Sequence, residues 1–161
     1  MKVGITGHQD LTIAESNWLK EELEIEIKQM KIEKAYSCLA IGADQLFARV
    51  ILSNNIPLIA VTPCSKYEQT FDNKNIELYR NLVTQAINEI QLEYDNPSEK
   101  AFYEAGKTVV NNSDVIFVFW NNLPSKGLGG TADIVSFAKS LNKKIIHLNP
   151  ITKTKKYINY G

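Results

Sequence analysis

Short apolar segments recur along the chain and are separated by longer amphipathic segments. The five clearest apolar segments are Val3–Thr6, Ala35–Ile41, Pro57–Thr62, Val115–Phe119 and Lys144–Leu148. Continuous runs rich in Val and Ile are typical of strands that are covered on both faces, so these segments predict a buried parallel sheet. A weaker apolar–polar alternation over Ile90–Tyr94 predicts one more strand.

The segments between the predicted strands carry apolar residues at helical spacing. The first covers Leu11–Met30, and Thr12–Glu15 at its start has the form of a capping box. Further helices are predicted from Ala43 to the Asn54–Asn55 pair, over Asn75–Glu89, over Ser98–Asn111 and over Thr131–Leu141. Strands and helices therefore alternate throughout, which predicts an α/β fold with a single Rossmann-like, doubly wound, mostly parallel sheet and helices on both faces.

Length and composition fit one globular domain. The chain has 161 residues, of which 44% are hydrophobic and 22% charged. These values are close to those of average globular proteins and argue against disorder and coiled coil. We expect one domain over residues 1–150, followed by a short basic C-terminal tail over residues 151–161 that is solvated or loosely docked.

The charge balance and the residue inventory exclude several classes of partner. Eighteen Lys and Arg cancel eighteen Asp and Glu, so the basic footprint of a nucleic-acid-binding protein is missing and nucleic acid is an unlikely partner. The sequence has no long apolar run and begins with a strand pattern instead of a signal peptide, so we expect no membrane association and a cytoplasmic location. Two distant cysteines, Cys38 and Cys64, and two histidines make a poor metal set. We therefore expect reduced thiols, no metal and no cofactor.

Three unusual segments follow predicted strands, where ligands gather in doubly wound folds. They are Thr6–Asp10, Gly42–Gln45 and Gly127–Asp133. In the last segment Gly129, Gly130 and Thr131 open a helix, and such a turn offers unpaired N–H groups and the positive end of the helix dipole to a phosphate. The alternative is a flexible loop with a glycine N-cap. The segment is neither a GxGxxG fingerprint nor a Walker A motif, so hydride transfer and ordinary ATP hydrolysis lose support.

The two earlier segments allow a structural and a functional interpretation. After the first strand, Gly7 exposes the backbone, and His8 and Gln9 are able to donate to a phosphate or a base, although a simple turn accounts for them equally well. After the second strand, Gly42 and Ala43 precede Asp44. The Asp44 carboxylate either caps the helix, which is the more economical interpretation, or accepts hydrogen bonds from a ribose.

The ordered set of motifs resembles the SLOG superfamily, which joins the Smf/DprA proteins to the Lonely Guy (LOG) enzymes, and is most similar to its YpsA-like branch. The resemblance covers roughly residues 2–149. The residues that carry it are GADQLFA at 42–48, NSDVIFVFW at 112–120 and GGTAD at 129–133, with Ala138–Lys139 and Lys143–Ile146.

The resemblance implies a nucleotide-binding domain with phosphate at the loop before the last helix, in relatives that are often ligand sensors. The LOG branch hydrolyses the N-glycosidic bond of nucleotides with an arginine and with the glutamate of a GGxGTxxE pattern. Here Ile134 stands in place of that glutamate and Asp133 lies one position earlier, while Lys107 falls near the place of the basic residue. Glu104 and Asp133 are the candidate catalytic carboxylates, and Lys107 is a candidate phosphate anchor, although lysine lacks the bidentate fork of arginine.

The sequence thus favours a domain that binds a nucleotide or a nucleotide-derived ligand as a sensor or regulatory module. The expected phosphate- and ligand-binding residues are Gly7, His8, Gln9, Gly42, Ala43, Asp44, Lys107, Gly129, Gly130 and Thr131. Two alternatives stay open, namely a LOG-like phosphoribohydrolase and single-stranded DNA binding of the Smf/DprA kind. The fold analogy also suggests a homodimer in which two chains complete one site.

Overall fold

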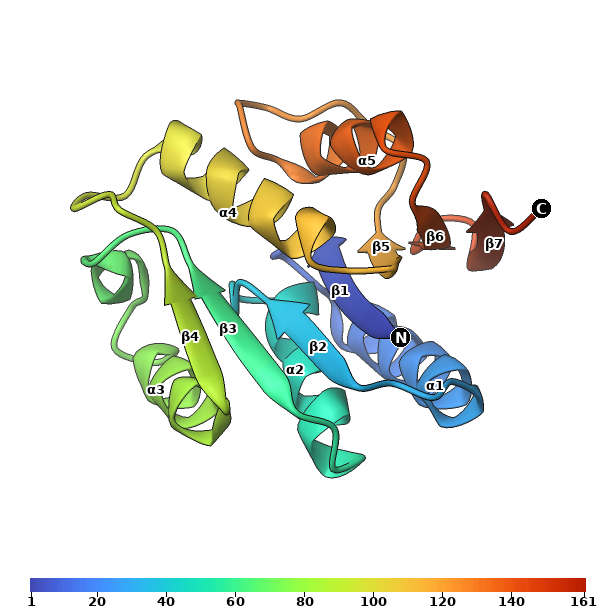
Figure 1. The fold of residues 1–161 in the computed structure, drawn as a ribbon, viewed down its shortest axis with the longest axis horizontal. Helices are drawn as coiled ribbons and strands as arrows, with labels where there is room; N and C mark the ends of the chain where they lie inside the picture. Colours follow the sequence, from blue (N-terminus) through green and yellow to red (C-terminus); the bar gives the residue numbers. More distant parts are fainter.

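The structure, a computed structural model, describes all of residues 1–161 and contains one seven-stranded sheet (Figure 1). In chain order the elements are β1 (Lys2–Gly7), α1 (Ile13–Gln29), β2 (Lys34–Ser37), α2 (Ala43–Ser53), β3 (Leu58–Thr62), the 3₁₀ helix η1 (Tyr67–Thr70), α3 (Ile76–Gln85), β4 (Asn88–Gln91), α4 (Glu99–Asn111), β5 (Val115–Phe119), α5 (Thr131–Ser140), β6 (Lys144–Asn149) and β7 (Thr154–Ile158). None of the helices has the length and the apolar character needed to cross a bilayer.

The strand order is β4-β3-β2-β1-β5-β6-β7. All neighbouring strands are parallel except β6 and β7, which run antiparallel. The chain builds outward from β1 to β4, then α4 crosses the sheet and the chain continues from β5 on the other side of β1. The predicted α/β doubly wound architecture is confirmed, and its switch point lies between β1 and β5.

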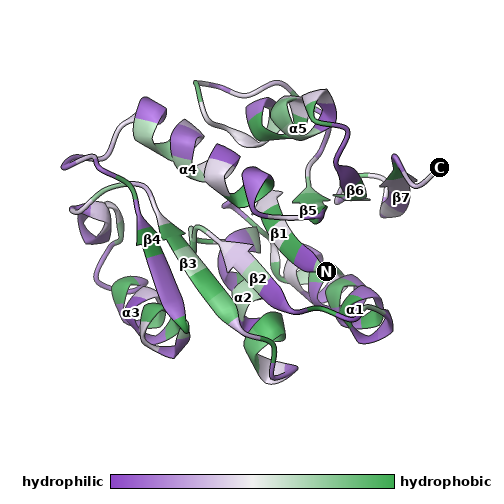
Figure 2. Cartoon of the chain, viewed as in Figure 1, coloured by the Kyte–Doolittle hydropathy of each residue, from purple (hydrophilic) through white to green (hydrophobic).

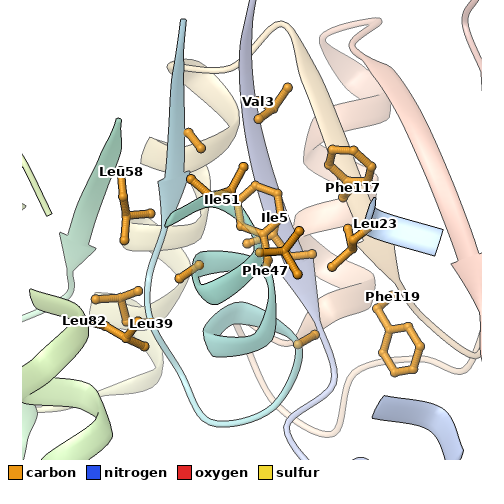
Figure 3. Close-up of a cluster of buried hydrophobic side chains, with 14 of the residues drawn as sticks. Val3, Ile5, Leu23, Leu39, Phe47, Ile51, Leu58, Leu82, Phe117 and Phe119 are labelled. Atoms are coloured by element: carbon orange, nitrogen blue, oxygen red, sulfur yellow. The ribbon is translucent and has the colours of Figure 1, made fainter. Parts of the chain in front are cut away.

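Helices α1, α2 and α3 cover one face of the sheet, and α4 and α5 cover the other (Figure 1). The larger apolar core lies on the first face, where Phe47 of α2 packs on Phe117 of β5 with 5.7 Å between ring centroids (Figure 3). The inner strand β5 is buried along its whole length, whereas the edge strand β4 is polar and largely exposed (Figure 2). The apolar pattern of the central strands thus follows from their burial on both faces.

On the second face α4 and α5 pack closely because one of the contacting residues is a glycine. A Cβ at Gly106 of α4 would lie 2.4 Å from the Cδ1 atom of Ile134 in α5. Ile134 is 3% exposed. Ile134, which stands where the resemblance places the LOG glutamate, therefore fills the contact between the two helices.

The predicted helices are confirmed with small shifts at their ends. Thr12 and Glu15 form the predicted capping box at the start of α1, and Ser98 caps α4. β2 is shorter than predicted, because the Ser37 hydroxyl accepts from the Leu39 N–H and donates to the Asp44 carbonyl, which turns the chain away from the sheet. The fourth strand covers Asn88–Gln91 instead of Ile90–Tyr94.

The C-terminal residues are more ordered than we expected, because residues 154–158 form strand β7 at the sheet edge. Glu26 of α1 is 4% exposed. Lys155 Nζ lies 2.8 Å from carboxylate oxygens of both Glu22 and Glu26, and the Tyr157 hydroxyl donates to Glu26. A buried carboxylate on α1 thus holds the C-terminal strand. The spacing of charged residues along the sequence does not reveal a pairing between segments so far apart.

We expect Lys155→Met to lower the free energy of unfolding by about 1–3 kcal/mol, because it leaves the buried Glu26 carboxylate without its cation. Lys156→Met is the matched control, since Lys156 is the exposed neighbour on the same strand, and it should change stability by less than about 0.5 kcal/mol. Urea unfolding followed by circular dichroism measures both effects. Equal effects of the two substitutions would contradict this role of Lys155.

Candidate functional site

A cleft of about 930 Å³ lies at the carboxyl end of the parallel strands. Its walls come from the loops that follow β1, β2, β3, β5 and β6 and from the start of α4. Predicted site residues that line it are Gly7, His8, Gln9, Asp44, Gly129, Gly130 and Thr131. The sheet topology therefore brings segments far apart in the sequence to the switch point, where doubly wound folds bind ligands.

The loop after β1 is held between β5 and α2 by backbone hydrogen bonds. The His8 N–H donates to the Phe119 carbonyl at 3.2 Å, and the His8 carbonyl accepts from the Ala43 N–H at 3.0 Å. Gly7 leaves no room for a side chain here, because a Cβ would lie 2.6 Å from Cβ of Ala43 and 2.9 Å from Cβ of Phe119. The predicted turn glycine is thus required by close packing.

The His8 side chain supports the next loop. Its Nε2 atom accepts a hydrogen bond from the Asn121 N–H at 3.0 Å. Burial lowers the pKa of His8, and the hydrogen bond to Asn121 only partly offsets this effect. The ring is therefore neutral at pH 7 with its proton on Nδ1, and it joins the end of β1 to the loop that follows β5.

Gly42 and Ala43 lie behind the cleft wall instead of lining it. Gly42 has a φ of +94°, and a Cβ there would lie 2.4 Å from the Gln9 carbonyl oxygen. Only glycine combines this backbone conformation with such a close approach. These two residues support the loop that carries His8 and Gln9, and the sequence does not distinguish that role from ligand contact.

The glycine-rich loop before α5 is fixed by Asp133 and Ser125. The Asp133 carboxylate accepts a hydrogen bond from the Gly129 N–H at 3.0 Å, and the Ser125 hydroxyl accepts one from the Asp133 N–H at 3.3 Å. Gly129 has a φ of +89°, and a Cβ there would lie 2.8 Å from the Tyr103 nitrogen. The loop is therefore packed against α4 and is linked to the first turn of α5 by the Asp133 carboxylate.

The first two N–H groups of α5 are unpaired. The N–H groups of Asp133 and Ile134 donate to the Gly130 carbonyl, whereas those of Thr131 and Ala132 have no hydrogen-bond partner in the structure. Gly130, the N-cap, has no side chain to satisfy them. Thr131 and Ala132 both line the cleft, so these donors and the positive end of the helix dipole face a space large enough for a ligand.

Asp44 is a buried carboxylate that faces the cleft without a charged partner. Its exposed fraction is 8%. Burial raises the pKa of Asp44 to about 7, and the nearby Ala40 N–H offsets only part of that effect. Asp44 does not cap α2, because the N–H groups of Ala43 and Gln45 donate to the carbonyls of His8 and Ala40. The Asp44 carboxylate therefore makes no capping hydrogen bond, although it lies in the first turn of α2, where its charge favours the helix dipole.

Three of the predicted residues, Lys107, Glu104 and Asp133, are not among those that line the cleft. The Lys107 ammonium lies 2.8 Å from the Glu104 carboxylate and 4.5 Å from the centre of the Tyr103 ring. The two helix residues thus pair with each other three positions apart. A phosphate-anchoring role of Lys107 and a catalytic role of Glu104 or Asp133 stay predictions, and the structure gives each of the three side chains a partner within the protein.

Sequence reasoning missed the contribution of α4 to the cleft. Ser98, Glu99 and Phe102 line it, as does Asn121 after β5. Phe102 is 37% exposed and offers an aromatic surface. The available signal was topological, because a helix that follows a parallel strand begins at the carboxyl edge of the sheet, and Ser98 was recognised as the start of such a helix.

The charged residues that line the cleft are mostly acidic. The acidic ones are Asp10, Glu15, Asp44 and Glu99, and the lining contains one lysine, Lys126. Two of these carboxylates have local partners, since Glu15 accepts from the Thr12 N–H at 3.1 Å and Glu99 lies against Gly127. The cleft therefore combines an anion-binding helix start with an acidic remainder, which suits a ligand that carries both an anion and hydrogen-bond donors.

No model of a known protein family and no curated protein matches the sequence. Solved structures match the fold. DprA from Streptococcus pneumoniae is 16% identical with a TM-score of 0.67 over 91% of this chain and 49% of that chain. DprA from Helicobacter pylori, whose structure concerns its single-stranded DNA binding mode, is 18% identical with a TM-score of 0.70 over 94% of this chain and 70% of that chain. The structural-genomics target TM1055 is 16% identical with a TM-score of 0.60 over 91% and 73% of the two chains.

These comparisons show that the chain shares the DprA fold, as the resemblance to Smf/DprA proteins implied. The chain spans about half the length of the Streptococcus pneumoniae protein. The similarity to the YpsA-like branch stays a prediction.

The buried Asp44 carboxyl should make stability fall as pH rises. Its pKa is about 7 in the folded chain, and unfolding returns it to about 4, so between these values the folded state binds more protons than the unfolded state. Raising the pH from 4 to 8 therefore lowers the free energy of unfolding of the wild type by an amount that Asp44→Asn does not lose. Over this range, the free energy of unfolding of the variant relative to that of the wild type should increase by about 2–4 kcal/mol.

Urea unfolding of the wild type and Asp44→Asn at pH 4.5, 6 and 8 measures this difference, and other titrating groups cancel in the comparison. A difference that stays constant with pH would show that Asp44 has an ordinary pKa in the folded protein.

Proposed function

We propose that this chain binds a nucleotide or a nucleotide-derived ligand, with a phosphate at the start of α5, and acts as a sensor or regulatory module. The observation that carries the proposal is the pair of unpaired N–H groups of Thr131 and Ala132, which open into the switch-point cleft. A phosphate accepts from such donors and is stabilised by the helix dipole. The glycine loop supports the proposal because the Asp133–Gly129 hydrogen bond and the close approach to Tyr103 position the start of α5.

Binding without turnover is favoured over nucleotide hydrolysis by the partners of the candidate carboxylates. Asp133 accepts from the Gly129 N–H, Glu104 pairs with Lys107, and Ile134 is buried against α4. A general acid or base must reach the reacting atom directly or through one water molecule. These side chains instead stabilise the loop and the helices around the cleft, so a sensor is the simpler function.

Single-stranded DNA binding receives less support from the charges around the cleft. A groove that follows a nucleic-acid backbone needs a row of basic side chains. This cleft presents four carboxylates and one lysine, Lys126, and it therefore suits one phosphorylated small molecule better than a strand of phosphates.

Ala132→Glu tests the phosphate position directly. The new carboxylate would lie beside the two free N–H groups and repel an anion, while a glutamate in the first turn of a helix favours folding. We expect at least a tenfold loss of affinity for whichever of the four ribonucleoside 5′-monophosphates the wild type binds, measured by calorimetry. Gly130 is a poorer test position, since a Cβ there would lie 2.6 Å from the Ser125 hydroxyl.

Ala132→Gln is the matched control, because it has the same size without the charge, and its affinity should fall by less than about threefold. Equal losses in the two variants would mean that the side chain blocks the cleft sterically. Unchanged affinity in Ala132→Glu would place the phosphate elsewhere.

If the domain is a sensor, the bound nucleotide should leave the protein chemically unchanged. Nucleotide should also raise the melting temperature in proportion to the logarithm of its concentration above Kd. Mass spectrometry of ligands that co-purify with the native protein, followed by incubation with excess nucleotide, checks both points. Free base or ribose 5-phosphate released at a rate proportional to protein concentration would favour the hydrolase.

A further inference from the structure

Asp44 is the one carboxylate lining the cleft that is buried and lacks a side-chain partner. Glu15 belongs to the capping box of α1, Glu99 lies against the glycine loop, and Asp10 is exposed to solvent. No side chain pairs with the Asp44 carboxylate, and the Ala40 N–H is the one donor close enough to affect it. At least one carboxylate oxygen is therefore free to accept a hydrogen bond from a molecule in the cleft.

This arrangement is costly for the folded protein. A buried carboxylate without a cation destabilises the structure in its ionised form. Asp44 makes no hydrogen bond that caps α2, because the first N–H groups of this helix donate to the carbonyls of His8 and Ala40, so its structural gain is limited to the helix dipole. A group that costs stability and faces a cleft is a candidate for ligand recognition.

The two ends of the cleft lie on opposite faces of the sheet. Asp44 belongs to α2, which packs on one face, and the free N–H groups belong to α5, which packs on the other (Figure 1). Both helix starts border the ends of β1 and β5. One ligand that lies across this edge of the sheet is therefore able to contact the anion site at the start of α5 with one end and the Asp44 carboxylate, a hydrogen-bond acceptor, with the other. In a nucleotide the donors next to the phosphate are the hydroxyls of the sugar.

We infer that Asp44 recognises the vicinal hydroxyls of the ligand's ribose, so that the cleft takes a ribose 5-phosphate unit and discriminates against its 2-deoxy counterpart. This inference rests on the proposed phosphate position at α5. Two adjacent hydroxyls match the acceptor capacity of a carboxylate, and the loss of one hydroxyl leaves a buried acceptor unsatisfied. Such a site discriminates against a 2-deoxy ligand more strongly than a site that recognises only the shape of the sugar.

Ribose 5-phosphate, 2-deoxyribose 5-phosphate and inorganic phosphate are suitable probes because they contain no base. We expect the wild type to bind ribose 5-phosphate about tenfold more tightly than the deoxy sugar at pH 8, measured by ligand-observed NMR or calorimetry. In Asp44→Asn the two affinities should become equal within about twofold. Asp10→Asn removes the same charge from an exposed position in the cleft and should keep the tenfold preference.

The outcomes separate the two proposals. Equal affinity of the wild type for both sugar phosphates, with binding still lost in Ala132→Glu, would overturn the role of Asp44 and leave the phosphate position intact. A preference that survives in Asp44→Asn, or one that disappears equally in Asp10→Asn, would also overturn it. If none of the three probes binds the wild type, the phosphate position fails, and this inference fails with it.

Discussion

The candidate site depends on the way the chain leaves β1. Three hydrogen bonds of His8 tie this loop to β5, to α2 and to the loop after β5. Glycines on either side permit the close approach, Gly7 beside Phe119 and Gly42 beside Gln9. Because β1 is the central strand at the switch point, fixing its exit also fixes the start of α2 with Asp44 and one wall of the cleft. A side chain larger than hydrogen at either glycine would separate elements that must meet there.

Several features of the cleft do not stabilise the fold on their own. The N–H groups of Thr131 and Ala132 lack partners, and Asp44 is buried without a cation. The neighbouring polar groups are satisfied, since Asp133 holds Gly129 and Glu104 holds Lys107. Unpaired donors and a buried carboxylate without a side-chain partner line the same cleft, so both are available to one ligand.

The fold was largely predictable from the sequence because its signals are local. The apolar runs marked the buried strands, and Thr12 with Glu15 marked the start of α1 through capping chemistry that acts within three residues. The start of α4 was predicted at Ser98, which the structure shows to be its cap. The edges were harder to predict, since β4 is polar and β7 depends on the pairing of Lys155 with Glu22 and Glu26, more than a hundred residues away. Such distant pairs have no periodic signature.

The sequence predicted where the candidate site lies better than which side chains line it. The glycine loop and the segment after β1 were expected at the carboxyl edge, and both line the cleft. The sequence could not say which way Lys107 points, because an acidic residue three positions earlier on the same helix competes with any ligand. It also could not show that the backbone already caps α2, which leaves Asp44 free to face the cleft.

Amide-resolved NMR during titration with ribose 5-phosphate tests the central claim most directly, because it reports on each N–H group separately. A phosphate bound at the start of α5 should shift the Thr131 and Ala132 amides most, with smaller changes near His8 and Asp44. Saturable shifts that concentrate on the lysines of β7, or none at the start of α5 while the ligand binds, would contradict the claim that these unpaired donors form the phosphate site.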